Sequence, residues 1–358
     1  MGWMRGTLAG GMLLGAIVLT YLGDRIHGEL VNFIAMTGAG AALAAFAWAP
    51  GVAVGMPMAV IVGITGAMLL ISVNTMLQRI VPNRWRGRVF GIADMATMSG
   101  LLTATGLLGL WPIPGLDACV PQVLTVLGVL MTATAMVMHG IQSRRAGMRG
   151  WQLLLWRLTQ FYAKWRFGVQ RVGPCTVPAQ GPAILAANHT SFIDPLLMYA
   201  TCPKRLIGFM VAKEYYDMPL IGWLLRGIGC IPATRTGQDL AATRDAIRRL
   251  EEGLLVGIFP QGRIERPDQD NRPRSGITLL AVHSRAPVIP VHISGTRHSE
   301  STAWSYLRRH KARVRYGRPV DLSEFYGRPI DRQTRERIAE LIWSRIQELA
   351  PQREGGAA

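Results

Sequence analysis

Residues 182–195 read Pro-Ala-Ile-Leu-Ala-Ala-Asn-His-Thr-Ser-Phe-Ile-Asp-Pro, and this stretch decides how the second half of the chain folds. Its first six residues are a short apolar run that predicts a buried strand, and the apolar run 195–203 predicts a helix. A polar loop containing His189 and Asp194 joins the two. Since functional side chains gather on loops at strand ends in α/β layers, this loop is the first candidate for chemistry.

The same alternation of short apolar runs and helical runs continues toward the C-terminus. Strands are expected at 182–187, 206–212, 228–232, 254–259, 287–293 and 312–317, and helices at 195–203, 214–227, 238–252, 274–285 and 331–349. This pattern predicts an α/β domain, a sheet covered by helices, over residues 172–350. The short segment 351–358 is expected to be a disordered tail.

The first 142 residues have a different composition. Five apolar stretches lie at about 3–22, 31–49, 53–77, 89–110 and 119–140. Each is close to the ~20 residues that a helix needs to cross a bilayer, and small residues that permit close helix packing are frequent. The sequence therefore predicts an all-α transmembrane bundle of about five helices over residues 1–142.

The distribution of charge predicts which side of the membrane the second half occupies. Residues 1–142 contain six Lys or Arg and four acids, whereas the whole chain contains 39 and 22. Arginines lie near residue 25, within 79–88 and after residue 140, while the turns near residue 50 and at 112–117 have none. Because basic loops stay inside, we expect a multi-pass protein of the cell inner membrane with a cytoplasmic C-terminal half. Its basic surface favours anionic membrane lipids as partners, and no nucleic acid.

Residues 143–171 are expected to connect the two halves as a basic juxtamembrane segment. Within them, residues 151–167 have apolar residues at helical spacing, three tryptophans and three basic side chains. This composition favours an amphipathic helix lying in the headgroup plane, with Trp156 and Phe167 toward its polar side. The alternative is an ordinary helix that faces the core of the following domain.

His189 and Asp194 have the residue types that deprotonation of a hydroxyl requires. A histidine near neutral pKa can take the proton, and a carboxylate on its other ring nitrogen fixes the tautomer and stabilises the imidazolium. The alternative for Asp194 is a helix N-cap followed by Pro195, and for His189 a surface position. The remaining histidines and the four cysteines are dispersed, so neither a metal site nor a cofactor is expected.

Four ordered blocks carry a resemblance to a known family, and they cover about residues 150–320. The segment 188–194 resembles the His-x4-Asp signature of the glycerolipid (lysophosphatidic-acid type) acyltransferases. Three later blocks resemble the rest of that family's pattern: Lys213 with Pro219, Gly222, Trp223 and residues 229–235; Phe259-Pro260-Gln261-Gly262-Arg263; and Val288-Ile289-Pro290-Val291.

The resemblance implies a phospholipid-synthesis enzyme and a role for each matching residue. His189 would be the general base on the glycerol hydroxyl of a lysophospholipid, Asp194 would orient it, and acyl-CoA or acyl carrier protein would donate the acyl group. Arg235 would bind the acceptor phosphate, which suits a guanidinium fork, and Gly262 would let backbone approach it. Further substrate-binding positions are Asn188, Ser191, Lys213, Gln261 and Arg263.

The third block departs from the family pattern. The usual Phe-Pro-Glu-Gly-Thr-Arg-Ser stands here as Phe-Pro-Gln-Gly-Arg-Ile-Glu at residues 259–265, so Gln261 lacks a charge and Ile264 replaces an arginine. Lysophospholipid acyltransferases fused to transporter and acyl-activating domains resemble this chain at Gly262-Arg263-Ile264. The acceptor is therefore lysophosphatidic acid or a lysophospholipid such as lysophosphatidylethanolamine, and low activity is an open alternative.

Two segments of the first half resemble the major facilitator superfamily of transporters. They are Gly23-Asp24-Arg25 and the connection formed by residues 74–79 and 86–91. Five spans match only the last part of a twelve-helix transporter, so a separate transporter half is a possible partner. The alternative function is a lysophospholipid transporter or flippase module whose acyltransferase domain is weak or inactive.

Overall fold

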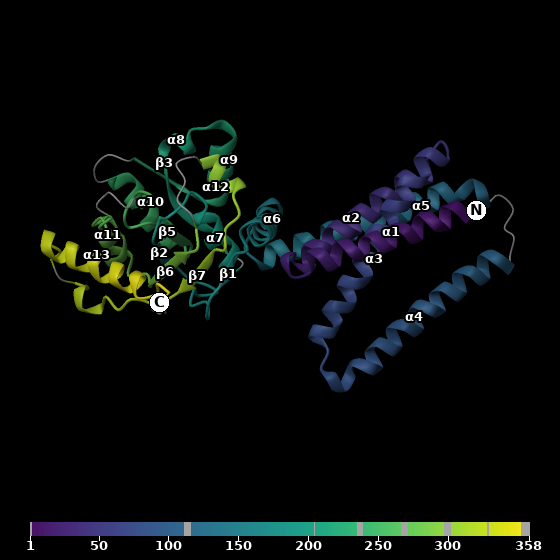
Figure 1. Cartoon of the computed structure of the whole chain (residues 1–358), viewed down its shortest axis with the longest axis horizontal. Coiled ribbons are helices and arrows are strands. Elements are labelled where there is room, and N and C mark those ends of the chain that lie inside the picture. Colours follow the sequence, from purple (N-terminus) through teal and green to yellow (C-terminus); the bar gives the residue numbers. More distant parts are fainter. Residues whose placement is uncertain are drawn as a thin grey trace, which may run out of the picture. The chain divides into compact units, whose positions relative to one another are not determined.

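The computed structural model describes residues 2–110, 116–203, 205–234, 239–265, 271–296, 302–327 and 329–351. Its Cα positions fall into two compact units, Met1–Gln142 and Ser143–Ala358 (Figure 1). The first unit is helical in the residues described, and the second contains a sheet with helices on both faces.

The helical unit contains α1 (Gly2–Leu22), α2 (Gly28–Ala47), α3 (Val52–Ile80), α4 (Asn83–Leu110) and most of α5 (Leu116–Arg145). Within the described residues, three helices are long and apolar enough to cross a bilayer: Gly28–Ala47, Val52–Ile80 and Cys119–Arg145. A shorter apolar helix covers Gly6–Leu22. Several apolar helices are therefore present, and a bundle of about five spans stays a prediction.

Glycines allow the helices of this unit to approach each other closely. A Cβ atom at Gly11 or Gly15 of α1 would overlap backbone atoms of Val60 or Ile64 on α3. Gly40 on α2 faces α5 in the same way. Small residues at such contacts are the usual device by which helices associate in lipid, where burial of apolar surface gives little driving force.

The second unit is built on a seven-stranded mixed sheet in the order β1-β7-β6-β2-β5-β3-β4. The strands are β1 (Gln170–Arg171), β2 (Ala183–Ala187), β3 (Ile207–Ala212), β4 (Ile231–Ala233), β5 (Leu255–Ile258), β6 (Val288–Ser294) and β7 (Arg313–Tyr316). All neighbours are parallel except β6 and β7. The central strand β2 is buried along its whole length, which explains its unbroken apolar sequence.

Helices cover both faces of this sheet. Buried residues of α6 (Gly150–Phe167) and α7 (Asp194–Thr201) pack on one face. Those of α10 (Leu240–Glu251), α11 (Gly276–Ser284) and α13 (Arg332–Gln347) pack on the other, as Figure 1 shows. Asp239 and Asp331 begin α10 and α13 by accepting backbone N–H bonds from the first turn. The predicted sheet covered by helices is thus present.

Three elements differ from the prediction. The expected helix 214–227 is two helices, α8 (Lys213–Tyr216) and α9 (Pro219–Ile228), because Met218 before Pro219 is extended. Strand β1 has two residues and α12 (Thr302–Leu307) has six, so neither gives a periodic signal. The 3₁₀ segments Gly23–Arg25 and Ser323–Phe325 complete the described elements.

The prediction that residues 151–167 form a helix in the headgroup plane is wrong about its faces. Trp156 and Phe167 are 4% and 0% exposed and belong to the core beneath the sheet. They share a stripe with Leu153 and Ala163 that points inward, so α6 is a core-facing helix, which was the alternative. Only the opposite stripe, with Leu158 and Trp165, is exposed.

Candidate active site

The predicted active-site loop lies at the edge of the sheet where the parallel strands end. β2 pairs with β5 through Ala186 and Ile258 and with β6 through Ala187 and Val291. The segments that follow these strands therefore emerge side by side, as carboxyl ends of parallel strands do. We call residues 188–194, after β2, the first loop and residues 259–265, after β5, the second loop.

In the first loop the structure brings His189 and Asp194 together. His189 Nδ1 lies 3.0 Å from Asp194 Oδ2, and the aspartate side chain is fully buried while the histidine is 17% exposed. The same carboxylate oxygen accepts backbone N–H bonds from Thr190 at 2.7 Å and Ser191 at 2.8 Å. The N-cap position of α7 is Ile193 and not Asp194. The carboxylate of Asp194 therefore binds the backbone of the loop and the imidazole of His189.

This arrangement fixes the histidine ring. With Nδ1 directed at Asp194, Nε2 is the ring nitrogen left to accept a proton. The ring also stacks on Phe259 of the second loop, with centroids 4.1 Å apart and planes 18° apart. Phe259 in turn stacks on Phe209 in β3. The imidazole is therefore held at one nitrogen and on one face, as a preorganised base requires.

The second loop is tied to the backbone of His189. The amide oxygen of Gln261, a residue that is 2% exposed, accepts the His189 N–H at 3.0 Å. Its Nε2 donates to Glu265 Oε1 at 2.5 Å, and the Glu265 N–H donates to the His189 carbonyl at 2.7 Å. Both backbone groups of His189 are thus satisfied by the second loop, which holds the two loops in register.

Gly262 occupies a tight turn of the second loop. Its φ is +70°, a left-handed conformation that favours glycine, and its N–H donates to the Phe259 carbonyl at 2.9 Å. The side chain of Arg274 lies alongside, because a Cβ atom at Gly262 would meet its Cδ at 3.3 Å. The backbone of Arg274 is held by the Pro260 carbonyl at 2.8 Å.

Three other predicted binding residues are Asn188, Ser191 and Lys213, and each has a different environment. Asn188 is buried, and its amide donates to and accepts from the backbone of Ile293 in β6 at 2.9 and 2.7 Å. The buried hydroxyl of Ser191 has no hydrogen-bond partner among the described residues. Lys213, at the start of α8, forms an exposed pair with Asp217 at 2.7 Å.

Two predicted arginines remain. Arg263 is exposed on the second loop next to Gly262. Arg235 lies outside the described residues.

Sequence reasoning missed Glu265, Arg274 and Thr296 as neighbours of the site. Thr296 follows β6 and shares a 2.6 Å hydroxyl contact with Thr190. Glu265 is visible in the sequence as a carboxylate four residues after the missing one at 261, and this spacing was the available signal. Arg274 follows residues 266–270 and gives no local signal, because only the turn at Pro260 brings it to Gly262.

Burial changes the titration of two side chains near this edge. Loss of solvation, with the negative charge of Asp194, raises the pKa of Glu265, while the bond from Gln261 and the nearby His189 oppose the rise. Burial and the neighbouring Arg315 lower the pKa of His292 in β6 to about 4. His292 is therefore neutral near pH 7, whereas Glu265 ionises at higher pH than an exposed glutamate.

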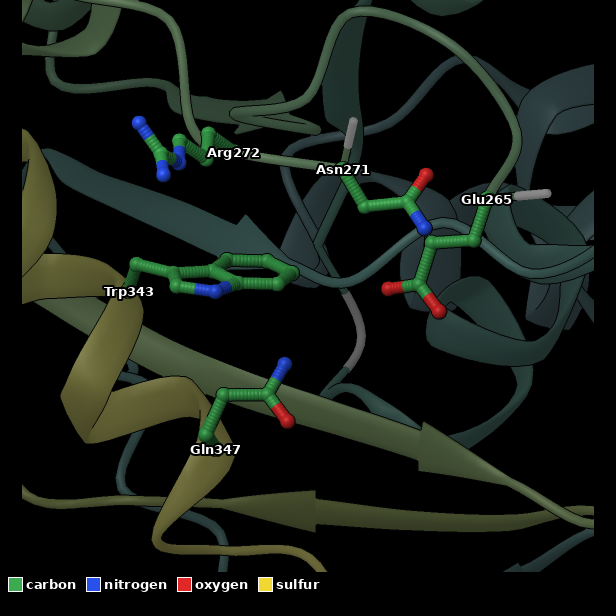
Figure 2. A pocket seen from close by; sticks show the side chains of 5 residues that line it. All are labelled: Glu265, Asn271, Arg272, Trp343 and Gln347. Carbon is green, nitrogen blue, oxygen red and sulfur yellow. The ribbon is translucent and has the colours of Figure 1, made fainter. Parts of the chain in front are cut away.

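A cavity of about 390 Å³ opens beside the second loop. Figure 2 shows Glu265, Asn271 and Arg272 on one side of it and Trp343 and Gln347, from α13, on the other. Glu265 thus lines this cavity and, through its N–H, also contacts His189 in the first loop.

An oriented histidine at the carboxyl edge of an α/β sheet is suited to deprotonate a substrate group. Residues 168–294 match the protein-family model described as Acyltransferase, so this part of the chain is an acyltransferase domain. The resemblance drawn from the four sequence blocks is confirmed at that level. The family match does not extend to residues 1–142, whose resemblance to transporters stays a prediction.

The names of two similar proteins agree with the family. The chain is 27% identical over 187 residues to a 1-acyl-sn-glycerol-3-phosphate acyltransferase of Bacillus subtilis, covering 51% of this chain and 89% of that protein. It is 26% identical over 170 residues to the enzyme of the same name from Streptococcus pneumoniae, covering 46% of this chain and 60% of that one.

A solved structure of the 1-acyl-sn-glycerophosphate acyltransferase PlsC from Thermotoga maritima also matches. It is 23% identical, with a TM-score of 0.42, and the match covers 54% of this chain and 79% of that one.

Proposed function

We propose that the chain transfers a fatty acyl group from acyl-CoA or acyl carrier protein to the free hydroxyl of a lysophospholipid, lysophosphatidic acid or a similar acceptor. The observation that carries this function is the contact between His189 Nδ1 and the fully buried Asp194 carboxylate. The names of the Bacillus and Streptococcus relatives support an acceptor of the 1-acylglycerol-3-phosphate type.

The transfer follows from the orientation of the base. His189 Nε2 takes the proton of the acceptor hydroxyl as its oxygen attacks the thioester carbonyl carbon, and Asp194 stabilises the imidazolium. A carbon–oxygen bond forms, the carbon–sulfur bond breaks, and the departing thiolate takes the proton from Nε2. The acceptor supplies the nucleophile, so no serine or cysteine is needed.

An acyl-transfer assay with labelled acyl-CoA or acyl carrier protein and a panel of lysophospholipids tests this function on the full chain in detergent or vesicles. We expect His189→Ala to reduce the rate to background. His283→Ala is the matched control, because His283 is exposed on α11, outside the site. Equal near-background rates for wild type and His189→Ala would instead favour the transporter module with an inactive domain.

The acceptor phosphate needs cationic partners, and the arginines near the second loop are the candidates. Arg274 lies against Gly262, and Arg263 adjoins it in the chain. Arg235 is proposed for the same role on the resemblance alone. A change that removes the positive charge at a phosphate contact should raise the Michaelis constant of the acceptor more than it lowers kcat. We expect this pattern for Arg235→Gln and Arg274→Gln, and an unchanged Michaelis constant would remove that arginine from the site.

A membrane location is proposed from the first unit. Three helices of spanning length and the loop charges support a multi-pass inner-membrane protein with its acyltransferase domain in the cytoplasm. In that orientation Cys119, which is exposed near the start of its helix, faces outward. A membrane-impermeant maleimide should label Cys119 in intact cells and should not label the Cys119→Ser variant; equal protection of both would reverse the orientation.

The exposed side of α9 supports contact of the acyltransferase domain with lipid. Leu220, Ile221 and Trp223 are exposed on this short helix, and Trp223 stacks on Trp151 of α6. An apolar helix face next to basic side chains fits the headgroup boundary. Changing Leu220 and Ile221 to Ser should raise the Michaelis constant for an acceptor in vesicles several-fold. The Michaelis constant for a detergent-dispersed acceptor should stay unchanged. Leu254→Ser, at a separate exposed turn, is the control.

A further inference from the structure

The carboxylate that the second loop lacks at position 261 is present at position 265. Gln261 links His189 to Glu265, since its oxygen accepts from the His189 N–H and its nitrogen donates to the Glu265 carboxylate. The Glu265 N–H returns to the His189 carbonyl. These three hydrogen bonds form a closed ring of His189, Gln261 and Glu265.

Two features set this ring apart from an ordinary surface contact. Gln261 is 2% exposed, and a buried amide with both ends engaged has one orientation. Glu265 is only half-buried, so it keeps a path to solvent, and the electrostatic influence of both His189 and Asp194 reaches it. Glu265 also lines the cavity of Figure 2, together with Asn271 and Arg272.

We propose that Glu265 is a positioning residue for acyl transfer: acting through Gln261, it holds the His189 backbone and supplies the negative charge missing at position 261. This role rests on the proposed acyltransferase function. A glutamate at 261 would bring its charge directly to the His189 N–H. Here the neutral amide relays the contact, and the charge sits one hydrogen bond further away.

The chemical consequence concerns the protonated base. When His189 takes the hydroxyl proton it becomes an imidazolium, which nearby negative charge stabilises. Asp194 acts on it directly through Nδ1, and the charge of Glu265 lies close enough to interact with His189 as well. The ring also prevents the His189 backbone from shifting, which keeps the imidazole on Phe259.

A charge-transposition experiment tests the role with wild type, Gln261→Glu, Glu265→Gln and the double variant. Glu265→Gln removes the charge but keeps the shape, and Gln261→Glu removes the donor and sets two carboxylates against each other. We expect each single change to lower kcat about 10-fold or more, with little effect on Michaelis constants. The double variant should recover to within a few-fold of wild type, because Gln at 265 can donate to Glu at 261.

The pH–rate profile separates this role from a purely structural one. With one negative charge fewer, protonation of the base becomes harder, so the acidic limb for Glu265→Gln should move to lower pH. Glu251→Gln, which removes an exposed carboxylate at the end of α10, is the control and should leave both rate and profile unchanged.

Two outcomes overturn different parts of the interpretation. If wild type is active but the effects of the single changes simply multiply in the double variant, Glu265 has no coupling to Gln261 and its role is refuted. If the wild type transfers no acyl group to any acceptor, the acyltransferase function fails, and the role of Glu265 fails with it.

Discussion

The two loops that meet at the candidate active site are supported in different ways. In the first loop, the Asp194 carboxylate binds the backbone of Thr190 and Ser191, two residues of the same loop. In the second loop, Gln261 and Glu265 direct their hydrogen bonds to each other and to His189 of the first. The contacts of the first loop join residues that are close in sequence, so its spacing alone indicates its role. The contacts of the second loop depend on His189 of the first loop, so its role follows only from the two loops together.

The largest expected effect tests the first loop. Asp194→Asn keeps the size of the side chain but removes the charge and can present an N–H to Nδ1, which favours the wrong tautomer of His189. We expect kcat to fall by about 10³–10⁴-fold, as in hydrolase triads. Rates measured with saturating donor and acceptor, beside a thermal melt of the same protein, check this. A decrease below about 10-fold in a folded variant would show that Asp194 does not orient the base.

The next effect concerns how the first loop is attached to the sheet. Asn188→Ala removes both hydrogen bonds to Ile293 and leaves two buried backbone groups unsatisfied, so the free energy of unfolding should fall by about 2–4 kcal/mol. Asn188→Asp keeps the acceptor for the Ile293 N–H and should fall between wild type and Ala. Denaturant titration of the three proteins provides the comparison. Equal stability of Asn188→Ala and wild type would show that the two hydrogen bonds to Ile293 do not hold the first loop on the sheet.

The third effect tests the turn of the second loop. Gly262→Ala places a Cβ at φ +70° and against Arg274, which should cost about 1–2 kcal/mol of stability and lower activity. Gly276→Ala is the matched control, because that glycine has an ordinary φ and open space around it. The control should be neutral or slightly stabilising. A Gly262→Ala variant as stable as the control would show that the turn tolerates a side chain.

The same contrast explains what could be predicted from the sequence. Strand β2 and the loop with four residues between His189 and Asp194 form a contiguous signal, so both the sheet and the pair could be predicted. The faces of α6 could not, because an amphipathic helix with Trp on several sides fits either lipid or a core, and only packing of Trp156 decides. The spacing of Glu265 from position 261 signals only a nearby carboxylate. Its part in the site depends on contacts between two loops, with His189 and Gln261 72 residues apart in sequence, and no local pattern reports those contacts.

The smallest expected effect separates the charge of Glu265 from its hydrogen bonds. Because the folded protein raises the pKa of this carboxyl, its contribution to stability is greatest below the ordinary value near 4.3 and is lost as pH rises through the folded pKa. Half exposure limits the change to under about 1 kcal/mol. Comparing unfolding free energies of wild type and Glu265→Gln between pH 4 and 8 should therefore show wild type losing stability relative to the variant as pH increases. A difference that is constant with pH would mean that the second loop uses Glu265 only as a hydrogen-bond acceptor, and that the charge of Glu265 contributes nothing.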